Sequence, residues 1–270
     1  MKQLHDFHVH STYCDGANTP REMVLKAIDN GFDTLGFSGH GYTDFDLSFC
    51  MSLVRTDDYI DEVRRLADEY AGRLNILCGV EQDYFSSNPT TRFDYVIGSV
   101  HYLYVNGKYV PLDMKVDTMR ALIDEVYGGD FSALACDYYR QVSDVANKTE
   151  CDIIGHFDLI TKFKNRTEIK FDERYFEAAF SAIDALIPYK KPFEINLGAI
   201  ARGYRGSPYP DAGLLQYIHD RGGEIVITGD CHNALFLGAN FEKAVEAAKA
   251  AGFCEQRILT AGESRLTTLP

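Results

Sequence analysis

Hydrophobic and polar positions alternate along the chain in two patterns. Short runs rich in Val, Ile and Phe, typical of strands buried on both faces, are separated by longer stretches in which apolar residues recur at helical spacing. The short runs predict seven strands, at residues 4–10, 34–38, 75–81, 95–101, 152–156, 193–196 and 225–229.

The stretches between these runs carry the signals of helices. Thr19 is suited to cap a helix and Pro20 to occupy its first turn, while Gly31 is suited to end it. Further helices are expected at residues 56–70, 117–127, 131–147, 172–187, 211–221 and 241–251.

Strands that alternate with helices in this way predict an α/β fold with a parallel sheet. Seven repeats favour a TIM-like (β/α)7 barrel, and an open doubly wound sheet is the alternative. No GxGxxG motif follows the first strand, which weakens a dinucleotide-binding version of that alternative. We expect a single domain over residues 1–270, with a helical insertion at about residues 113–150.

Composition and charge narrow the range of partners. The chain is 46% hydrophobic and 25% charged, which is ordinary for a globular protein, and its net charge is −13. Such an acidic balance argues against nucleic acid or an anionic membrane as the main partner. The apolar runs are shorter than the roughly 18 residues that cross a bilayer, and the N-terminus shows no secretory signal.

The cysteines add information about the compartment. There are seven of them, irregularly spaced and without a CxxC pair, which indicates reduced thiols in a cytoplasmic protein. No pattern in the sequence predicts an interface, so the oligomeric state is left open.

The histidines show the strongest chemical pattern. Five of the eight stand at or just after the end of a predicted strand: His10, His40, His101, His156 and His232. His8 lies two residues before His10, so both imidazoles point to one side of a strand and can chelate one ion. His5 and His219 lack this placement and are expected to be structural or surface residues.

Acidic residues occupy the same level of the predicted barrel. Glu81 and Asp230 each follow a strand, and Asp15 lies in the loop after His10. Any one of these residues alone has an ordinary explanation, such as a helix cap. Nine His, Asp and Glu side chains at strand ends instead predict a site for several metal ions, because the carboxyl ends of barrel strands meet at one face.

In this order, the residues resemble the PHP superfamily, named for polymerase and histidinol phosphatase. The resemblance spans nearly the whole chain and rests on these segments: His8-Val9-His10-Ser11, Ser38-Gly39-His40, Gly79-Val80-Glu81, Gly98-Ser99-Val100-His101, Ile154-Gly155-His156-Phe157-Asp158, Glu194-Ile195-Asn196 and Gly229-Asp230-Cys231-His232. The spacing and length look most like the bacterial monofunctional histidinol-phosphate phosphatases, and the long polymerase chain is absent.

The resemblance implies a distorted (β/α)7 barrel that holds three divalent metal ions, which would be zinc, manganese or iron. Carried over by position, the first metal would take His8, His10, Glu81 and Asp230. The second would take His101 and His156, with Glu81 bridging. The third would take His40, His232 and Asp15, where some relatives have histidine in place of Asp15.

The implied reaction is hydrolysis of L-histidinol phosphate to L-histidinol and phosphate, in histidine biosynthesis. A metal-bound hydroxide would attack the phosphorus, without a covalent phosphoenzyme, and Asp230 or His232 would carry the proton. Relatives place basic phosphate-binding residues in two loops, where Arg202 and Lys162 stand here.

The organic part of such a substrate carries an amine and an imidazole. Acidic and aromatic residues in the loop at 41–46, together with Tyr102 and Tyr104, are candidates to receive it. Two other functions stay open at this point: a PHP phosphoesterase for another phosphomonoester, such as a nucleotide, a sugar phosphate or phosphotyrosine, and a non-catalytic metal-binding regulatory module.

Overall fold

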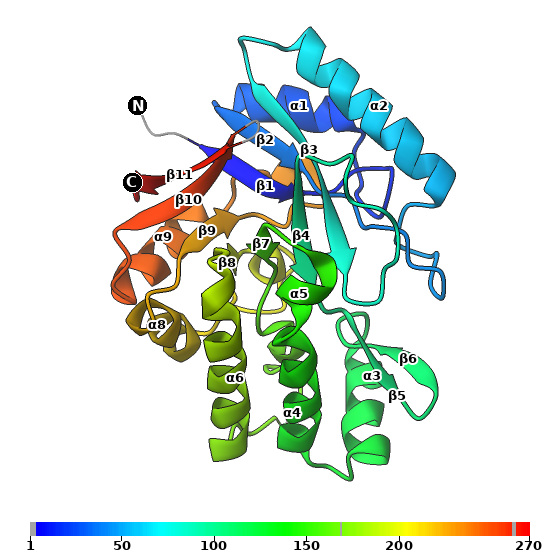
Figure 1. Cartoon of the computed structure of the whole chain (residues 1–270), viewed down its shortest axis with the longest axis vertical. Coiled ribbons are helices and arrows are strands. Elements are labelled where there is room, and N and C mark those ends of the chain that lie inside the picture. The colour runs from blue at the N-terminus through cyan, green and yellow to red at the C-terminus, as the bar shows by residue number, and fades with distance from the viewer. Residues whose placement is uncertain (1–3, 168, 261–262) are drawn as a thin grey trace.

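Parallel strands form a seven-stranded central sheet (Figure 1), in the order β1-β2-β3-β4-β7-β8-β9. The structure is a computed structural model, and it describes residues 4–167, 169–260 and 263–270. The strands are β1 His5–Val9, β2 Thr34–Phe37, β3 Asn75–Asp83, β4 Tyr95–Ser99, β7 Ile153–Ile154, β8 Phe193–Asn196 and β9 Ile225–Thr228. All seven predicted strands are therefore confirmed.

The first and last strands of the sheet approach each other at their C-terminal ends. Val9 pairs in parallel with Cys231. The backbone N–H of His10 donates to the Cys231 carbonyl, and the N–H of Cys231 donates to the His8 carbonyl, both at 2.9 Å. The sheet is thus nearly closed into a distorted barrel, which confirms the predicted fold class and rules out the open doubly wound sheet.

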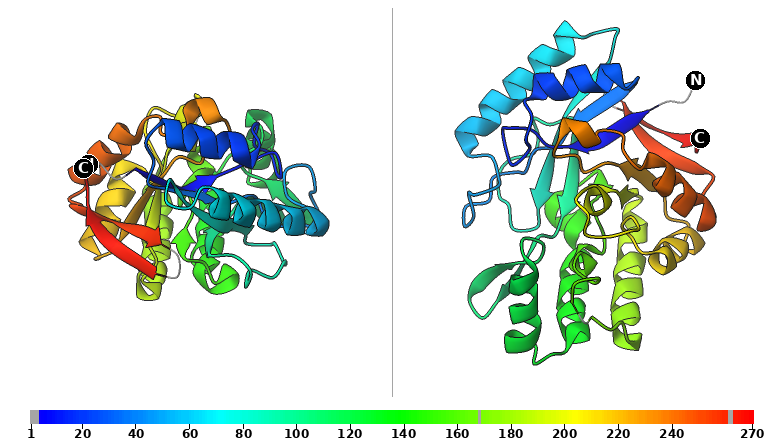
Figure 2. Two further views of the ribbon diagram at one scale, coloured as in Figure 1. Left: turned by 90° about the horizontal axis from the view of Figure 1, so that it is seen from above. Right: turned by 180° about the vertical axis from the view of Figure 1, so that it is seen from behind.

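The helices lie around the outside of the strands (Figure 2). Their bounds are α1 Pro20–Asp29, α2 Leu53–Glu69, α3 Val116–Ala121, α4 Phe131–Val142, α5 Val145–Thr149, α6 Glu173–Leu186, α7 Gly198–Ala201, α8 Ala212–Asp220 and α9 Phe241–Ala250. Helix α1 begins as expected, because Thr19 caps it and Glu22 completes a capping box. In the part of the chain that the structure describes, no helix has the length and apolar character that a membrane span requires.

Some helix boundaries differ from the predicted ones. Helix α2 begins three residues early because the Ser52 hydroxyl accepts from the N–H of Arg55 and caps it. The helix expected at 117–127 changes after α3 into a π-helical turn, Leu122–Val126. The helix expected at 131–147 divides into α4 and α5.

Two antiparallel hairpins were not predicted: β5 Tyr102–Val105 with β6 Lys108–Pro111, and β10 Glu255–Thr260 with β11 Glu263–Thr268. The first has a clear sequence signal, because Asn106 and Gly107 both adopt positive φ, 51° and 79°, in its turn. An Asn-Gly pair between apolar residues is typical of a tight hairpin.

The inside of the barrel changes from apolar to polar along the strands. Leu77, Gly79 and Glu81 share one side of β3. Leu77 joins a buried apolar cluster with Tyr95, whereas Glu81 lies among the polar groups at the strand ends. The ring of Tyr95 fills the space beside Gly79, where a Cβ would lie 2.3 Å from it, and its hydroxyl donates to the Phe7 carbonyl at 2.6 Å. This apolar base supports the polar mouth above it.

Candidate metal centre

The nine predicted ligands all gather at the C-terminal ends of the strands, with the carboxylate of Glu81 at the centre. One oxygen of Glu81, Oε2, lies 3.0 Å from Nε2 of His8 and 3.0 Å from Nδ1 of His40. The other, Oε1, lies 2.9 Å from Nε2 of His156 and 3.3 Å from Nε2 of His101. A single carboxylate therefore contacts imidazoles from four separate parts of the chain.

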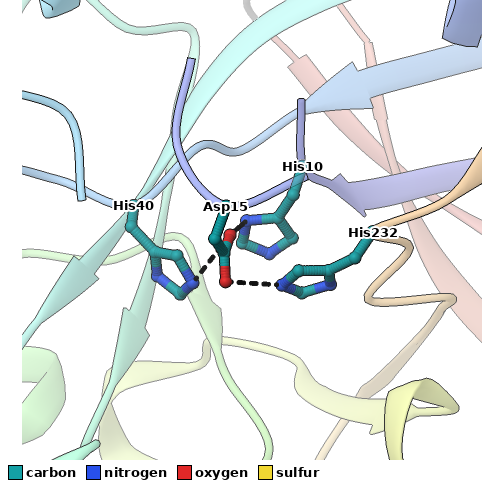
Figure 3. Close-up of side chains that lie close together, drawn as sticks. All are labelled: His10, Asp15, His40 and His232. Carbon is teal, nitrogen blue, oxygen red and sulfur yellow. Dashed lines mark ion pairs between the residues drawn. The ribbon is translucent and has the colours of Figure 1, made fainter. Parts of the chain in front are cut away.

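Ligand atoms in the described residues form three groups in which every atom lies within 4.8 Å of the others. The groups are His10, Asp15, His40 and His232; His8, His10 and Asp230; and His40, Glu81 and His101. Figure 3 shows the first group, in which the Asp15 carboxylate points between three imidazoles. It lies 3.6 Å from Nε2 of His40 and 3.2 Å from Nε2 of His232.

These groups differ in part from the sets carried over by resemblance. His10 belongs to two groups here, and His40 also joins Glu81 and His101. His156 is in none of the three groups, although its Nε2 approaches Glu81. The imidazoles are thus close enough together for one of them to serve either of two neighbouring metal positions.

Burial and charge act together on these side chains. Burial opposes the charge on Glu81, but the imidazoles of His8 and His40 hold the pKa of Glu81 well below its ordinary value. Burial, with the neighbouring imidazoles of His232 and His40, lowers the pKa of His10 well below its ordinary value. The carboxylate is thereby ionised and the His10 imidazole neutral, which are the forms that bind metal. Around His8 and His40 the neighbouring carboxylates outweigh burial and raise the pKa of both imidazoles, so a divalent ion would bind there in place of a proton.

The residues present fit divalent metal ions. Among the described residues, Nε2 of His8, Nε2 of His10 and Oε2 of Glu81 are buried without a hydrogen-bond partner. Buried polar atoms are almost always paired, so a convergent unpaired set calls for a ligand. Imidazole nitrogens and carboxylate oxygens are the donors that zinc, iron and manganese accept.

The end of β9 supplies two of these side chains through a strained turn. Asp230 adopts a φ of 46°, in the left-handed region that is unfavourable for most residues. Nδ1 of His232 lies 3.1 Å from the Asp230 carbonyl. Strain of this kind, about 1–3 kcal/mol, persists where the surrounding structure holds it, commonly at functional sites.

Glu194 is a site residue that the sequence analysis quoted only as part of a motif. It is fully buried on β8, and its Oε1 lies 2.5 Å from Nδ1 of His8 and accepts from the Thr228 hydroxyl at 2.6 Å. Its Oε2 accepts from the backbone N–H of His156 at 2.6 Å. A charged residue between two buried apolar residues, Phe193 and Ile195, was the signal that could have identified it.

The two predicted phosphate-binding residues both line the mouth. Nη2 of Arg202 donates to Oδ2 of Asp230 at 2.9 Å, and its Nη1 lies 3.0 Å from Nδ1 of His232. Nζ of Lys162 donates to Oδ2 of Asp113 at 3.0 Å. Each cation thus sits beside the clustered ligands, held by a carboxylate.

A cavity of about 300 Å³ opens over the clusters, a size that suits a small metabolite. Phe49, Tyr102 and Tyr204 form its aromatic walls. Tyr102 therefore lies where the sequence analysis expected it. Tyr104, however, is 56% exposed and packs on Tyr109, outside the lining of this cavity.

Two predicted non-ligands also lie where they were expected. His5 stacks on Phe7 within β1, and His219 is a surface residue beside Asp220. Neither joins any of the three groups found among the described residues.

Comparison with known proteins decides the family. A PHP domain model matches residues 6–197. This chain belongs to the PHP family. The PHP chain is 31% identical, over 93% of its length and 95% of the other chain, to a protein of Deinococcus radiodurans named as a probable histidinol-phosphatase. It is 27% identical to the histidinol-phosphatase of Bacillus subtilis, over 90% and 99% of the two chains.

A solved structure shares the fold of this PHP chain. It is the histidinol phosphate phosphatase of Lactococcus lactis, in complex with zinc, L-histidinol and phosphate. The TM-score is 0.69 with 24% identity, and the match covers 97% of this PHP chain and 98% of the other.

Proposed function

We propose that this PHP chain is a metal-dependent phosphomonoesterase that hydrolyses L-histidinol phosphate to L-histidinol and phosphate. The observation that carries the proposal is that three groups of His, Asp and Glu side chains converge on one cavity, which Arg202 also lines. The names of the Deinococcus and Bacillus relatives support the substrate. So do the zinc, histidinol and phosphate in the Lactococcus structure.

Nine side chains would hold the metals: His8, His10, Asp15, His40, Glu81, His101, His156, Asp230 and His232. Glu81 is the natural bridge, because its two oxygens face different imidazoles. When bound, divalent ions would supply positive charge for the phosphoryl oxygens and lower the pKa of a bound water to near neutrality. Retention of all nine side chains argues against a non-catalytic regulatory module.

The chain's own cations would bind and orient the phosphate. The guanidinium of Arg202 can donate to two phosphoryl oxygens at once, and the Asp230 carboxylate keeps it at the edge of the clusters. Lys162 would add a second positive charge from the loop after His156. These two cations would then stabilise the negative charge that grows on the phosphoryl group during the reaction, without having to move.

Protons must reach the departing alkoxide and leave the attacking water. His232 is the most exposed of the six site histidines, with its side chain 21% exposed, and it lies between Asp15 and Asp230. We therefore assign proton transfer to Asp230 or His232, at the carboxylate oxygen or ring nitrogen that a metal ion does not occupy. We also propose a reducing, cytoplasmic setting, because all seven cysteines are free thiols.

The test is a panel of phosphomonoesters assayed with the zinc- or manganese-loaded chain. The panel contains L-histidinol phosphate, a nucleoside monophosphate, a sugar phosphate and phosphotyrosine. We expect kcat/KM to be highest for L-histidinol phosphate by at least tenfold. Faster turnover of another ester would support a different PHP phosphoesterase, and bound metal without turnover of any ester would support a regulatory module.

A further inference from the structure

One carboxylate in the cavity has no place in the metal groups. The cavity is lined by four acidic residues, Asp15, Glu81, Asp113 and Asp230, and the groups found among the described residues include all of these except Asp113. Asp113 lies just after β6, and its side chain is 25% exposed. The cavity therefore carries a negative charge that metal binding does not explain.

Such a charge is unfavourable in a phosphate site unless a cation accompanies it. A phosphate dianion and a carboxylate repel each other across a short distance, and this repulsion becomes stronger as water is excluded. Lys162 neutralises part of the charge, because its Nζ donates to Oδ2 and to the backbone carbonyl of Asp113, at 3.0 and 2.7 Å. The structure gives no hydrogen bond to Oδ1 of Asp113 from the described residues.

We propose that Asp113 binds the ammonium group of the substrate and so selects phosphate esters of amino alcohols. The inference rests on the proposed function and adds the residue that recognises the amine. Asp113 would accept a charge-assisted hydrogen bond from the ammonium group through Oδ1, while Lys162 and Arg202 bind the phosphate. Esters without a cation would leave Oδ1 of this carboxylate close to the phosphate without a hydrogen-bond donor.

The chemistry of the ester matches the position of Asp113. In an amino alcohol phosphate such as L-histidinol phosphate, the amine is on the carbon next to the ester carbon. The ammonium group therefore stays close to the phosphate, and its acceptor must lie beside a phosphate-binding cation. Asp113 is in direct contact with Lys162, and the ring of Tyr204 lies 5.1 Å from the same Nζ.

A different role for Asp113 predicts a different result. If Asp113 only held Lys162 in position, its loss would weaken phosphate binding equally for every ester. If it binds the ammonium group, its loss affects only esters that carry one. Two esters that differ in the amine alone separate these roles: L-histidinol phosphate and 3-(imidazol-4-yl)propyl phosphate.

The experiment measures kcat/KM and calorimetric affinity for both esters with the metal-loaded chain and with Asp113→Asn, Lys162→Ala and Asp117→Asn. Asp117 is the matched control, because it lies four residues away and its side chain is 94% exposed. We expect the wild-type chain to prefer the amine-bearing ester at least tenfold, and Asp113→Asn to lower that ratio at least tenfold. Lys162→Ala should weaken the binding of both esters and keep the ratio of their kcat/KM values. Asp117→Asn should leave both the kcat/KM values and their ratio unchanged.

An equal loss for both esters in Asp113→Asn would overturn the inference. A wild-type chain without preference for the amine would overturn it as well. If neither ester is hydrolysed, the proposed function fails, and binding decides the inference: an affinity preference that Asp113→Asn removes supports it, and equal affinities refute it.

Discussion

Glu194 lies 2.5 Å from Nδ1 of His8, on the side of the imidazole opposite to Glu81, which lies 3.0 Å from Nε2. The ring is thus fixed between two buried carboxylates. When a metal ion is bound, His8 would donate its Nδ1–H to Glu194 and hold the ion through Nε2. Carboxylates behind metal-binding histidines commonly orient the ring and raise its basicity in this way.

Replacing Glu194 by Gln should therefore weaken metal binding without removing a ligand. We expect a loss of about 10- to 100-fold in metal affinity or activity. The measurement is zinc affinity by competition with a chelating dye, together with kcat/KM. Glu177→Gln, on the exposed face of α6, is the matched control and should behave as wild type. Unaltered metal affinity in Glu194→Gln would show that His8 does not need this partner.

Removal of metal should lower both activity and stability. Unpaired buried atoms of His8, His10 and Glu81 would be left facing one another, at a cost that bound metal removes. A ligand present at 100 times its Kd stabilises a folded protein by about 2.7 kcal/mol. Treatment with a chelator should thus abolish turnover and lower Tm by several degrees, and zinc or manganese should restore both. Equal Tm values with and without metal would contradict this.

Arg202 offers a test of phosphate recognition. Arg202→Lys keeps the charge but loses the paired N–H groups, so kcat/KM should fall by about tenfold or more. Arg202→Ala also leaves the buried carboxylate of Asp230 without its ion pair, and should cost considerably more. Metal content, measured on the same samples, separates loss of phosphate binding from loss of the metal site. Wild-type kinetics in both variants would remove Arg202 from the reaction.

The apolar base of the barrel makes a prediction about stability. A Cβ at Gly79 would lie 2.3 Å from the ring of Tyr95, so Gly79→Ala should lower the free energy of unfolding by about 1–3 kcal/mol. Gly213 lies in α8 with open space around it, and Gly213→Ala should raise that free energy by about 0.5–1 kcal/mol. Denaturant titration of both variants checks the difference. Similar values for the two substitutions would indicate that the interior rearranges freely around Tyr95.

The sequence predicted the strands and the gathering of ligands because both depend on local patterns. Apolar runs mark the buried strands, and residues such as His40 and His156 stand at fixed places after them. The fold then brings strand ends together whatever the sequence between them. The gathering of the ligands could therefore be predicted once the strands and their order along the chain were identified.

Features that depend on contacts between distant segments were not predictable in the same way. The pairing of Glu194 with His8 joins residues 186 positions apart, and the pairing of Lys162 with Asp113 joins two loops. The division of the helix expected at 131–147 into α4 and α5 also depends on packing against the rest of the fold. Asn106-Gly107, by contrast, is a local signal of a tight hairpin, because both residues adopt positive φ in the turn.

The central claim is that metals held around Glu81 carry the hydrolysis, and the most direct measurement is metal content and turnover of L-histidinol phosphate on the same samples. Zinc or manganese would be titrated into the metal-free wild-type chain and into Glu81→Gln. We predict that wild-type kcat/KM rises in step with bound metal, whereas Glu81→Gln binds less metal and is slower by at least a hundredfold. Full turnover by the metal-free chain, or by Glu81→Gln, would contradict the account.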